Sequence, residues 1–211
     1  MKTKEFIITI FFIVTSLLVY AFFPAKNNFE QVAAALIFFI ILPFLLNKFF
    51  LKKDLSFYGL SLGDWKQGIK WSGYSLVGMG IIFFVLSYYF GFLKNYSVPT
   101  FIVGNFTNFL FYEFVISLFF VFMYEFYFRG FVLFVFEQKI GNWSVLAQTG
   151  IFCILVFSGM GQLSIYSFLP YIAFAPFAGI IAYKSRSILY SGIVQFVILL
   201  ILNVLVIKMA V

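Results

Sequence analysis

The sequence contains no histidine at all. Histidine is the commonest metal ligand in proteins and the usual proton shuttle near neutral pH, so most zinc sites and general bases are ruled out at once. A serine, histidine and aspartate triad is excluded for the same reason. The chain has a single cysteine, Cys153, and its 7 Asp and Glu residues are scattered along its length. We therefore predict no metal site and no cofactor.

Charge is scarce as well. Charged residues make up 10% of the chain and hydrophobic residues 64%, and the mean hydropathy is +1.09. Soluble domains usually contain about 25% charged residues, because a globular surface must be covered with polar groups. The few charges also avoid the long apolar runs, which is the pattern that a bilayer imposes. The sequence therefore predicts an integral membrane protein, with the lipid bilayer as its surroundings.

The apolar runs are long enough for transmembrane helices, since about 20 residues cross the hydrocarbon core. We predict an all-α fold, a polytopic membrane helical bundle of about seven transmembrane helices, in one domain over residues 1–211. The first run is too long for a signal peptide and no small-residue cleavage site follows it, so we expect it to be retained. The expected spans are Phe6–Phe23, Val32–Phe50, Ile69–Leu93, Phe106–Tyr124, Val145–Met160, Phe168–Tyr183 and Ile188–Ile207.

The stretch between the fourth and fifth spans, Glu125–Lys139, is apolar but carries charges. It is too short to cross the membrane again, so it either continues the fourth helix or forms a helix partly in the interface. The loop Leu51–Lys70 contains turn-forming residues and then Trp65. It predicts a short amphipathic helix on the inner leaflet.

Basic residues are distributed unequally between the two sides of these spans. An excess of Lys and Arg in short loops marks the cytoplasmic face, which places the N-terminus in the cytoplasm and the C-terminus outside. The net charge of +7 is then a topology signal, and no nucleic acid is expected as a partner. The cytoplasmic flanks would contain Lys2, Lys4, Lys48, Lys52, Lys53, Lys66, Lys70, Lys139, Lys184 and Arg186, and the outer flanks Lys26, Lys94 and Lys208.

Charged residues inside the spans are costly and need an explanation. Glu125 and Arg129 are four positions apart, so on a helix they share a face and form a structural pair. A paired carboxylate and guanidinium costs far less in a membrane than either group alone. Glu113 lies in the middle of the fourth span, where we expect it to be protonated or paired with a residue of another helix or protein. With Gln195 it defines a second possible intramembrane polar site.

The segment Tyr124–Gly130, YEFYFRG, resembles the EExxxR motif of the CPBP family of intramembrane metalloproteases, which includes the CAAX proteases and the bacteriocin-immunity (Abi) proteins. The segment AGIIAYKSRSILYSGIVQFVILLILN is similar to the last two spans of that family, and the loop FYGLSLGDW to the segment before its third span. The resemblance covers about residues 105–205. It implies a CAAX-protease-like core.

The family's catalytic positions are not matched by catalytic side chains. The second Glu and the Arg of EExxxR correspond to Glu125 and Arg129, but Tyr124 stands where the family has the water-activating Glu. The positions of the two histidines correspond to Gly161 and Gln195. Glycine has no ligand atom, and a tyrosine with an ordinary pKa of about 10 is a weak base at neutral pH. The resemblance therefore implies a degenerate member without a catalytic site.

We predict a pseudoenzyme that acts as a scaffold, an accessory subunit, or an immunity or regulatory factor. Its partner would be another integral membrane protein or a hydrophobic or lipidated peptide. Two alternatives stay open: a divergent protease that uses Glu125 with Glu113 or Gln195, and a transporter or channel subunit whose polar path contains Glu113, Glu125 and Arg129. Short loops and the absence of a targeting segment favour the plasma (inner) membrane of a prokaryote.

Overall fold

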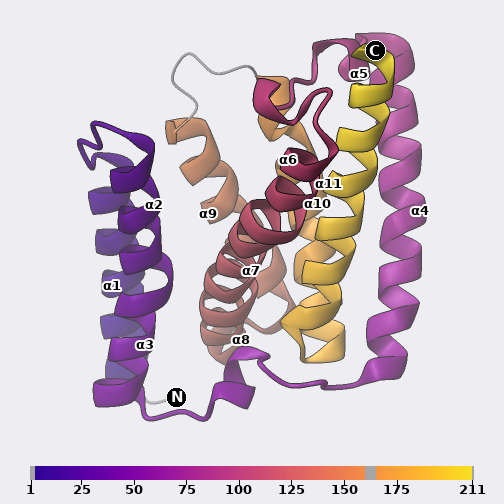
Figure 1. Ribbon diagram of the computed structural model, residues 1–211. Helices are drawn as coiled ribbons and strands as arrows, with labels where there is room; N and C mark the ends of the chain where they lie inside the picture. The colour runs from indigo at the N-terminus through magenta and orange to yellow at the C-terminus, as the bar shows by residue number, and fades with distance from the viewer. Residues whose placement is uncertain (1–2, 160–164, 211) are drawn as a thin grey trace.

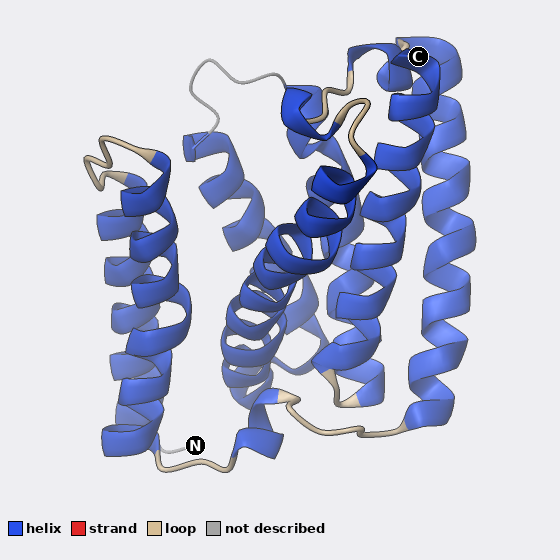
Figure 2. Ribbon diagram, viewed as in Figure 1, coloured by secondary structure: helices blue, strands red, loops and turns tan. Residues whose placement is uncertain are grey.

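The computed structural model describes residues 3–159 and 165–210 of the chain. This part is a bundle of helices without strands (Figure 2). The α-helices are α1 (Thr3–Ala21), α2 (Asn28–Leu36), α3 (Leu42–Leu46), α4 (Trp65–Phe90), α5 (Phe92–Asn95), α6 (Phe106–Phe111), α7 (Leu118–Tyr124), α8 (Leu133–Ile140), α9 (Ser144–Gly159), α10 (Ile165–Ser185) and α11 (Ile188–Ala210).

Shorter segments of other helix types connect these helices or interrupt them. The π-helical segments are η1 (Ile37–Ile41), η2 (Asn47–Leu51), η5 (Tyr112–Ser117) and η6 (Glu125–Val132), and the 3-10 segments are η3 (Leu55–Tyr58), η4 (Thr100–Ile102) and η7 (Gly141–Trp143). The π-helical segments lie in line with their α-helical neighbours. From α2 to η2, and again from α6 to α8, the chain therefore forms one long helix.

In the described residues, six helical stretches are long and apolar enough to cross a membrane. One of them, Phe106–Ser158, reverses its direction at Gly141, whose φ of 53° favours glycine. Figure 1 shows α9 returning from this turn, packed against α8 and η6, so this stretch contains the fourth expected span and most of the fifth. The predicted all-α polytopic bundle is confirmed. The fifth expected span runs to Met160, which lies outside the described residues.

The long helix from α6 to α8 crosses the bundle diagonally (Figure 1). At about 1.5 Å per residue it extends about 50 Å, longer than the roughly 30 Å hydrocarbon core, so it must tilt. It continues without interruption through Glu125–Val132, and every residue of η6 is buried. The stretch after the fourth span therefore continues that helix, as the first of the two alternatives predicts.

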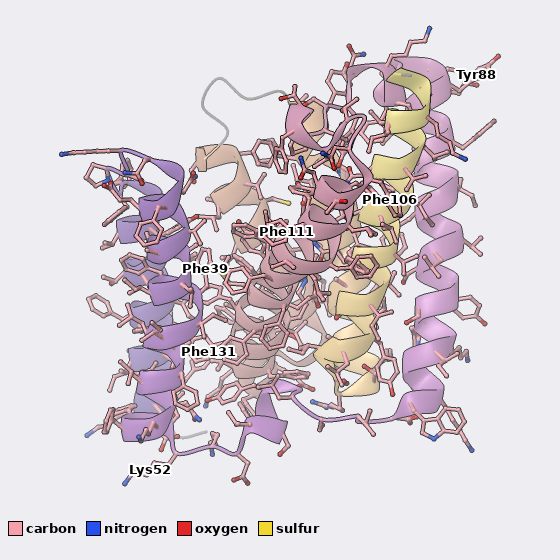
Figure 3. The ribbon with its side chains drawn as sticks, in the orientation of Figure 1. Phe39, Lys52, Tyr88, Phe106, Phe111 and Phe131 are labelled. Atoms are coloured by element: carbon pink, nitrogen blue, oxygen red, sulfur yellow. The ribbon has the colours of Figure 1, made fainter. Side chains whose placement is uncertain are left out.

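Two groups of helices pack on either side of η6. The α1–α2–α3 hairpin packs against it through buried aromatic and aliphatic side chains that include Ile13, Phe39 and Phe128, and Figure 3 shows Phe39 between the hairpin and the diagonal helix. On the other side α4, α10 and α11 share a second core around Met79, Phe174 and Ile198. The segment η6 contacts η1, η3, α9, α10 and α11, so it lies at the centre of the bundle.

The loop before α4 does not form the amphipathic helix that the sequence predicts. It has a single four-residue 3-10 turn, η3, followed by an extended segment bound to the turn between α10 and α11. The backbone N–H of Asp64 donates to the carbonyl of Ser185 (2.7 Å), and the N–H of Ile188 donates to the carbonyl of Gly59 (3.0 Å). These long-range hydrogen bonds replace those of a helix, which is why local amphipathicity is misleading here.

The buried side chain of Asn47 closes the turn between η2 and η3. The side chain of Asn47 receives hydrogen bonds from the Tyr58 hydroxyl (2.7 Å) and the Lys53 N–H (3.0 Å), and donates to the Lys53 carbonyl (2.8 Å). Burial raises the pKa of the Tyr58 hydroxyl, which keeps it protonated as a donor. The side chain of Asn47 thereby holds η3 in its position against η6.

Candidate functional site

The charged pair predicted from the sequence lies at the centre of the bundle. The Nε atom of Arg129 is 3.4 Å from Oε1 of Glu125, and the two side chains are 0% and 1% exposed. Both belong to η6, whose helical course places positions i and i+4 on one side. The structure therefore brings Glu125 and Arg129 together, in surroundings where each charge needs the other.

The second oxygen of Glu125 has a partner from a distant part of the chain. The Ser191 hydroxyl, on α11, donates a hydrogen bond to Oε2 of Glu125. Sequence analysis missed Ser191. The signal that could have found it is its spacing, because it lies one helical turn before Gln195 and hence on the same face of α11.

The guanidinium of Arg129 has few polar contacts. It stacks over the ring of Phe152 on α9, at 4.9 Å from the ring centroid. Within the described part of the chain, none of its three nitrogens has a hydrogen-bond partner, so the ion-pair contact of Nε with Glu125 and the ring of Phe152 provide its stabilisation. The carboxylate of Glu125 is therefore essential for keeping this charge in the membrane.

The glycine that follows Arg129 has a packing role. A Cβ atom on Gly130 would lie 2.8 Å from the carbonyl oxygen of Tyr58 in η3, closer than side chains allow. The absence of a side chain lets the loop approach η6 directly. Close packing between η6 and η3 therefore accounts for the glycine at position 130, and no catalytic role is needed to explain it.

Tyr124 points away from the charged pair. Adjacent residues on a helix are about 100° apart, so the neighbour of Glu125 faces a different side of the bundle. The Tyr124 ring packs edge-on against Phe152 at 6.1 Å and at an angle to Phe39 at 5.8 Å. Tyr124 therefore belongs to an aromatic wall and is not hydrogen-bonded to the pair.

Gln195 and Gly161 complete the positions derived from the resemblance. Gln195 is buried on α11, and in the described residues neither its Oε1 nor its Nε2 has a hydrogen-bond partner. Gly161 lies outside the described residues. Gln195 thus lies one helical turn after Ser191, without a hydrogen bond to the pair in the described residues, whereas nothing can be built on the position of Gly161.

Glu113 belongs to a separate polar cluster. Its Oε1 accepts a hydrogen bond from Nδ2 of Asn203 (2.6 Å), and Oδ1 of Asn203 accepts one from the Tyr96 hydroxyl (3.0 Å). Asn203 and Gln195 are both on α11, at positions about 12 Å apart along the helix axis. Glu113 therefore pairs with Asn203, and the structure does not bond it to Gln195.

A cavity of about 350 Å³ lies beside Tyr124, between α1, α2, the η5–α7 segment, α9 and α10. Its wall includes four tyrosines, and no charged side chain lines it in the described residues. The full lining consists of Tyr20, Gln31, Tyr112, Ile116, Ser117, Phe120, Tyr124, Phe152, Leu155, Val156, Phe168 and Tyr171.

The residues at these positions do not fit a metal ion. In the described part of the chain no three His, Cys, Asp or Glu side chains gather in one place. Oε2 of Glu125 accepts a hydrogen bond from Ser191, and Oε1 makes an ion-pair contact of 3.4 Å with Nε of Arg129 but has no hydrogen-bond partner in the described residues. Zinc is held by imidazole, thiolate and carboxylate groups, and Tyr124 and Gln195 provide none of them. We therefore derive no chemical step that uses a metal.

The fold and the site define a polytopic α-helical membrane protein with a buried ion pair beside a tyrosine-lined cavity. Residues 107–201 match the family model described as Rce1-like, type II CAAX prenyl endopeptidase Rce1-like. Over this segment the chain is similar to the CAAX-protease (CPBP) family, in agreement with the resemblance of Tyr124–Gly130. We find no significant match among curated proteins or among solved structures.

Proposed function

We propose that this CAAX-protease-like membrane protein is catalytically inactive and acts by binding. Its partner is another integral membrane protein or a hydrophobic or lipidated peptide, for which it is a scaffold, an accessory subunit, or an immunity or regulatory factor. The whole chain, 1–211, acts as one domain. The observation that carries the proposal is Tyr124, which stands at the position of the family's water-activating Glu and forms part of an aromatic wall.

Two further features support a binding role. The Glu125 carboxylate already has Arg129 and Ser191 as partners, which suits a structural role better than activation of water. A cavity of about 350 Å³ lies beside Tyr124, and cavities of roughly 300–1,000 Å³ are the size that binds small molecules or side chains. A family-like sequence, a cavity and the absence of proton-transferring side chains at the family's catalytic positions together support the proposal.

The proposal predicts that the purified protein has neither bound zinc nor peptidase activity. We expect less than about 0.1 equivalent of zinc by elemental analysis after purification in mild detergent. We also expect no cleavage of a panel of membrane peptides and farnesylated peptides. Native purification with mass spectrometry should identify a stoichiometric membrane partner.

Glu125→Gln and Glu137→Gln are the matched variants for this test, because Glu137 pairs with Arg186 outside the central cluster. One equivalent of zinc, or peptide cleavage, that is lost in Glu125→Gln and kept in Glu137→Gln would contradict the proposal. That result would support the divergent protease instead.

We further propose that the protein lies in a prokaryotic plasma membrane with the N-terminus in the cytoplasm. The start of α1, the α8–α9 turn and the α10–α11 turn lie at one end of the bundle, and the end of α11 lies at the other (Figure 1). Lys52 lies at the first end and Tyr88 near the second (Figure 3). The end with the α1 start thus includes the basic flanks expected in the cytoplasm.

Cysteine labelling in intact cells tests this orientation. In a Cys153→Ala background, Lys94→Cys should react with a membrane-impermeant maleimide, whereas Lys66→Cys should react only after the cells are permeabilised. Both lysines are exposed, so differences in burial do not explain a difference in labelling. Labelling of Lys66→Cys alone in intact cells would reverse the orientation.

A further inference from the structure

The cavity beside Tyr124 has polar groups without partners. The hydroxyls of Tyr20, Tyr112, Tyr124 and Tyr171 make no hydrogen bond within the described part of the chain, although all four side chains line the cavity. These tyrosines are half-buried and their hydroxyls are open to the cavity, so the cluster offers hydrogen-bonding atoms to a ligand bound there.

The lining also limits the charge of that ligand. None of the described side chains that line the cavity is ionic. An ionised head group would lose its hydration there without gaining a counter-ion, which is costly in a low-dielectric site. A neutral head with carbonyl or hydroxyl oxygens matches tyrosine hydroxyls, which both donate and accept.

The remaining lining favours an aliphatic tail. A groove of about 740 Å³ between α2 and the η5–α7 segment shares Ile116 and Phe120 with the cavity, and its lining is entirely apolar. A second groove, of about 360 Å³ between α1 and α9, shares Leu155 with it. Both grooves include strongly exposed side chains, such as Phe114 and Ile154, which a bilayer would cover. A ligand can therefore enter from the lipid between helices.

We propose that this cavity binds a neutral, single-chain lipid, with its ester or hydroxyl head among the four tyrosine hydroxyls and its acyl chain along one of the two grooves. The ligand class follows from three features together: unpartnered hydroxyls, an uncharged wall and continuity with apolar surfaces. The site is distinct from the Glu125–Arg129 pair, because Phe152 separates the guanidinium from the cavity that its ring helps to line.

Monoolein is the probe, and oleyl sulfate, which has the same chain and a permanent charge, is its counterpart. By native mass spectrometry we expect the delipidated protein to bind monoolein at least about tenfold more tightly than oleyl sulfate. The double variant Tyr112→Phe/Tyr171→Phe should weaken monoolein binding about tenfold, because two hydrogen bonds are removed while the rings are kept. Ile116→Trp should weaken it by filling the cavity.

Tyr88→Phe/Tyr89→Phe is the control, because these tyrosines of α4 are 73% and 71% exposed. It should bind monoolein like the parent, and each variant must elute as a single folded species. Equal binding of the two probes, or equal binding by the parent and the Tyr112→Phe/Tyr171→Phe variant, would overturn the inference. Retention of a hydrophobic peptide but not of monoolein would also overturn it. Hydrolysis of monoolein would instead contradict the proposed function, so the two failures are distinguishable.

Discussion

Replacing Arg129 with alanine is expected to lower the free energy of unfolding by about 3–5 kcal/mol, because it leaves the buried carboxylate of Glu125 without its partner. The Arg129 side chain is 0% exposed, so water cannot compensate for the loss. The truncation also removes the stacking contact with Phe152. The measurement is the yield of folded protein in detergent together with the midpoint of thermal unfolding.

Arg186→Ala is the control for a charged pair near the surface. Arg186 also forms an ion pair, with Glu137, whose side chain is 8% exposed, but the Arg186 side chain itself is 57% exposed, so its loss should cost less than the loss of Arg129. The double variant Glu125→Gln/Arg129→Met should recover much of the stability lost in Arg129→Ala, because no buried charge remains. If Arg129→Ala is as stable as the parent, the pair does not hold the bundle together.

Gly63→Ala is the second substitution for which we expect a large loss. Gly63 has a φ of +53°, and a Cβ atom there would lie 2.1 Å from the carbonyl oxygen of Ser185. The chain cannot move away without breaking the hydrogen bond from the Asp64 N–H to that same oxygen, at 2.7 Å. Backbone strain and displacement of the loop together should reduce the free energy of unfolding by about 2–4 kcal/mol.

Gly73→Ala is the matched control for this loss. Gly73 is a helical residue of α4, and a Cβ atom there would meet nothing within 4 Å. Since alanine is favoured over glycine in helices by up to about 1 kcal/mol, this variant should be as stable as the parent or slightly more stable. Thermal unfolding of Gly63→Ala and Gly73→Ala in the same detergent tests this prediction. Equal midpoints would show that the contact between Gly63 and the α10–α11 turn does not stabilise the fold.

Much of the membrane architecture is predictable from the sequence, because a bilayer requires long apolar helices and restricts where charges lie. The third expected span began at Ile69, whereas α4 begins at Trp65 after the N-cap Asp64, whose side chain accepts from the Gln67 N–H. The cap is a local signal of helix start that hydropathy alone overlooks. The loop before it could not be predicted in the same way, because its hydrogen bonds go to a turn more than a hundred residues later.

The surroundings of Glu125 and Arg129 are likewise predictable from the sequence only in part. The sequence by itself determined that Glu125 and Arg129 meet, since positions four apart on a helix are neighbours whatever the rest of the chain does. It also determined that no histidine is available to hold a metal. Both conclusions depend only on composition and short-range geometry.

The tertiary structure alone decided the other partners. Ser191 reaches Glu125, and Asn203 reaches Glu113, only because α11 packs beside the diagonal helix. The four tyrosines meet around one cavity because four different helical elements bring them together. Helical periodicity determines which residues of one helix share a face. Which faces meet depends on packing among all the helices, and no local pattern in the sequence records it.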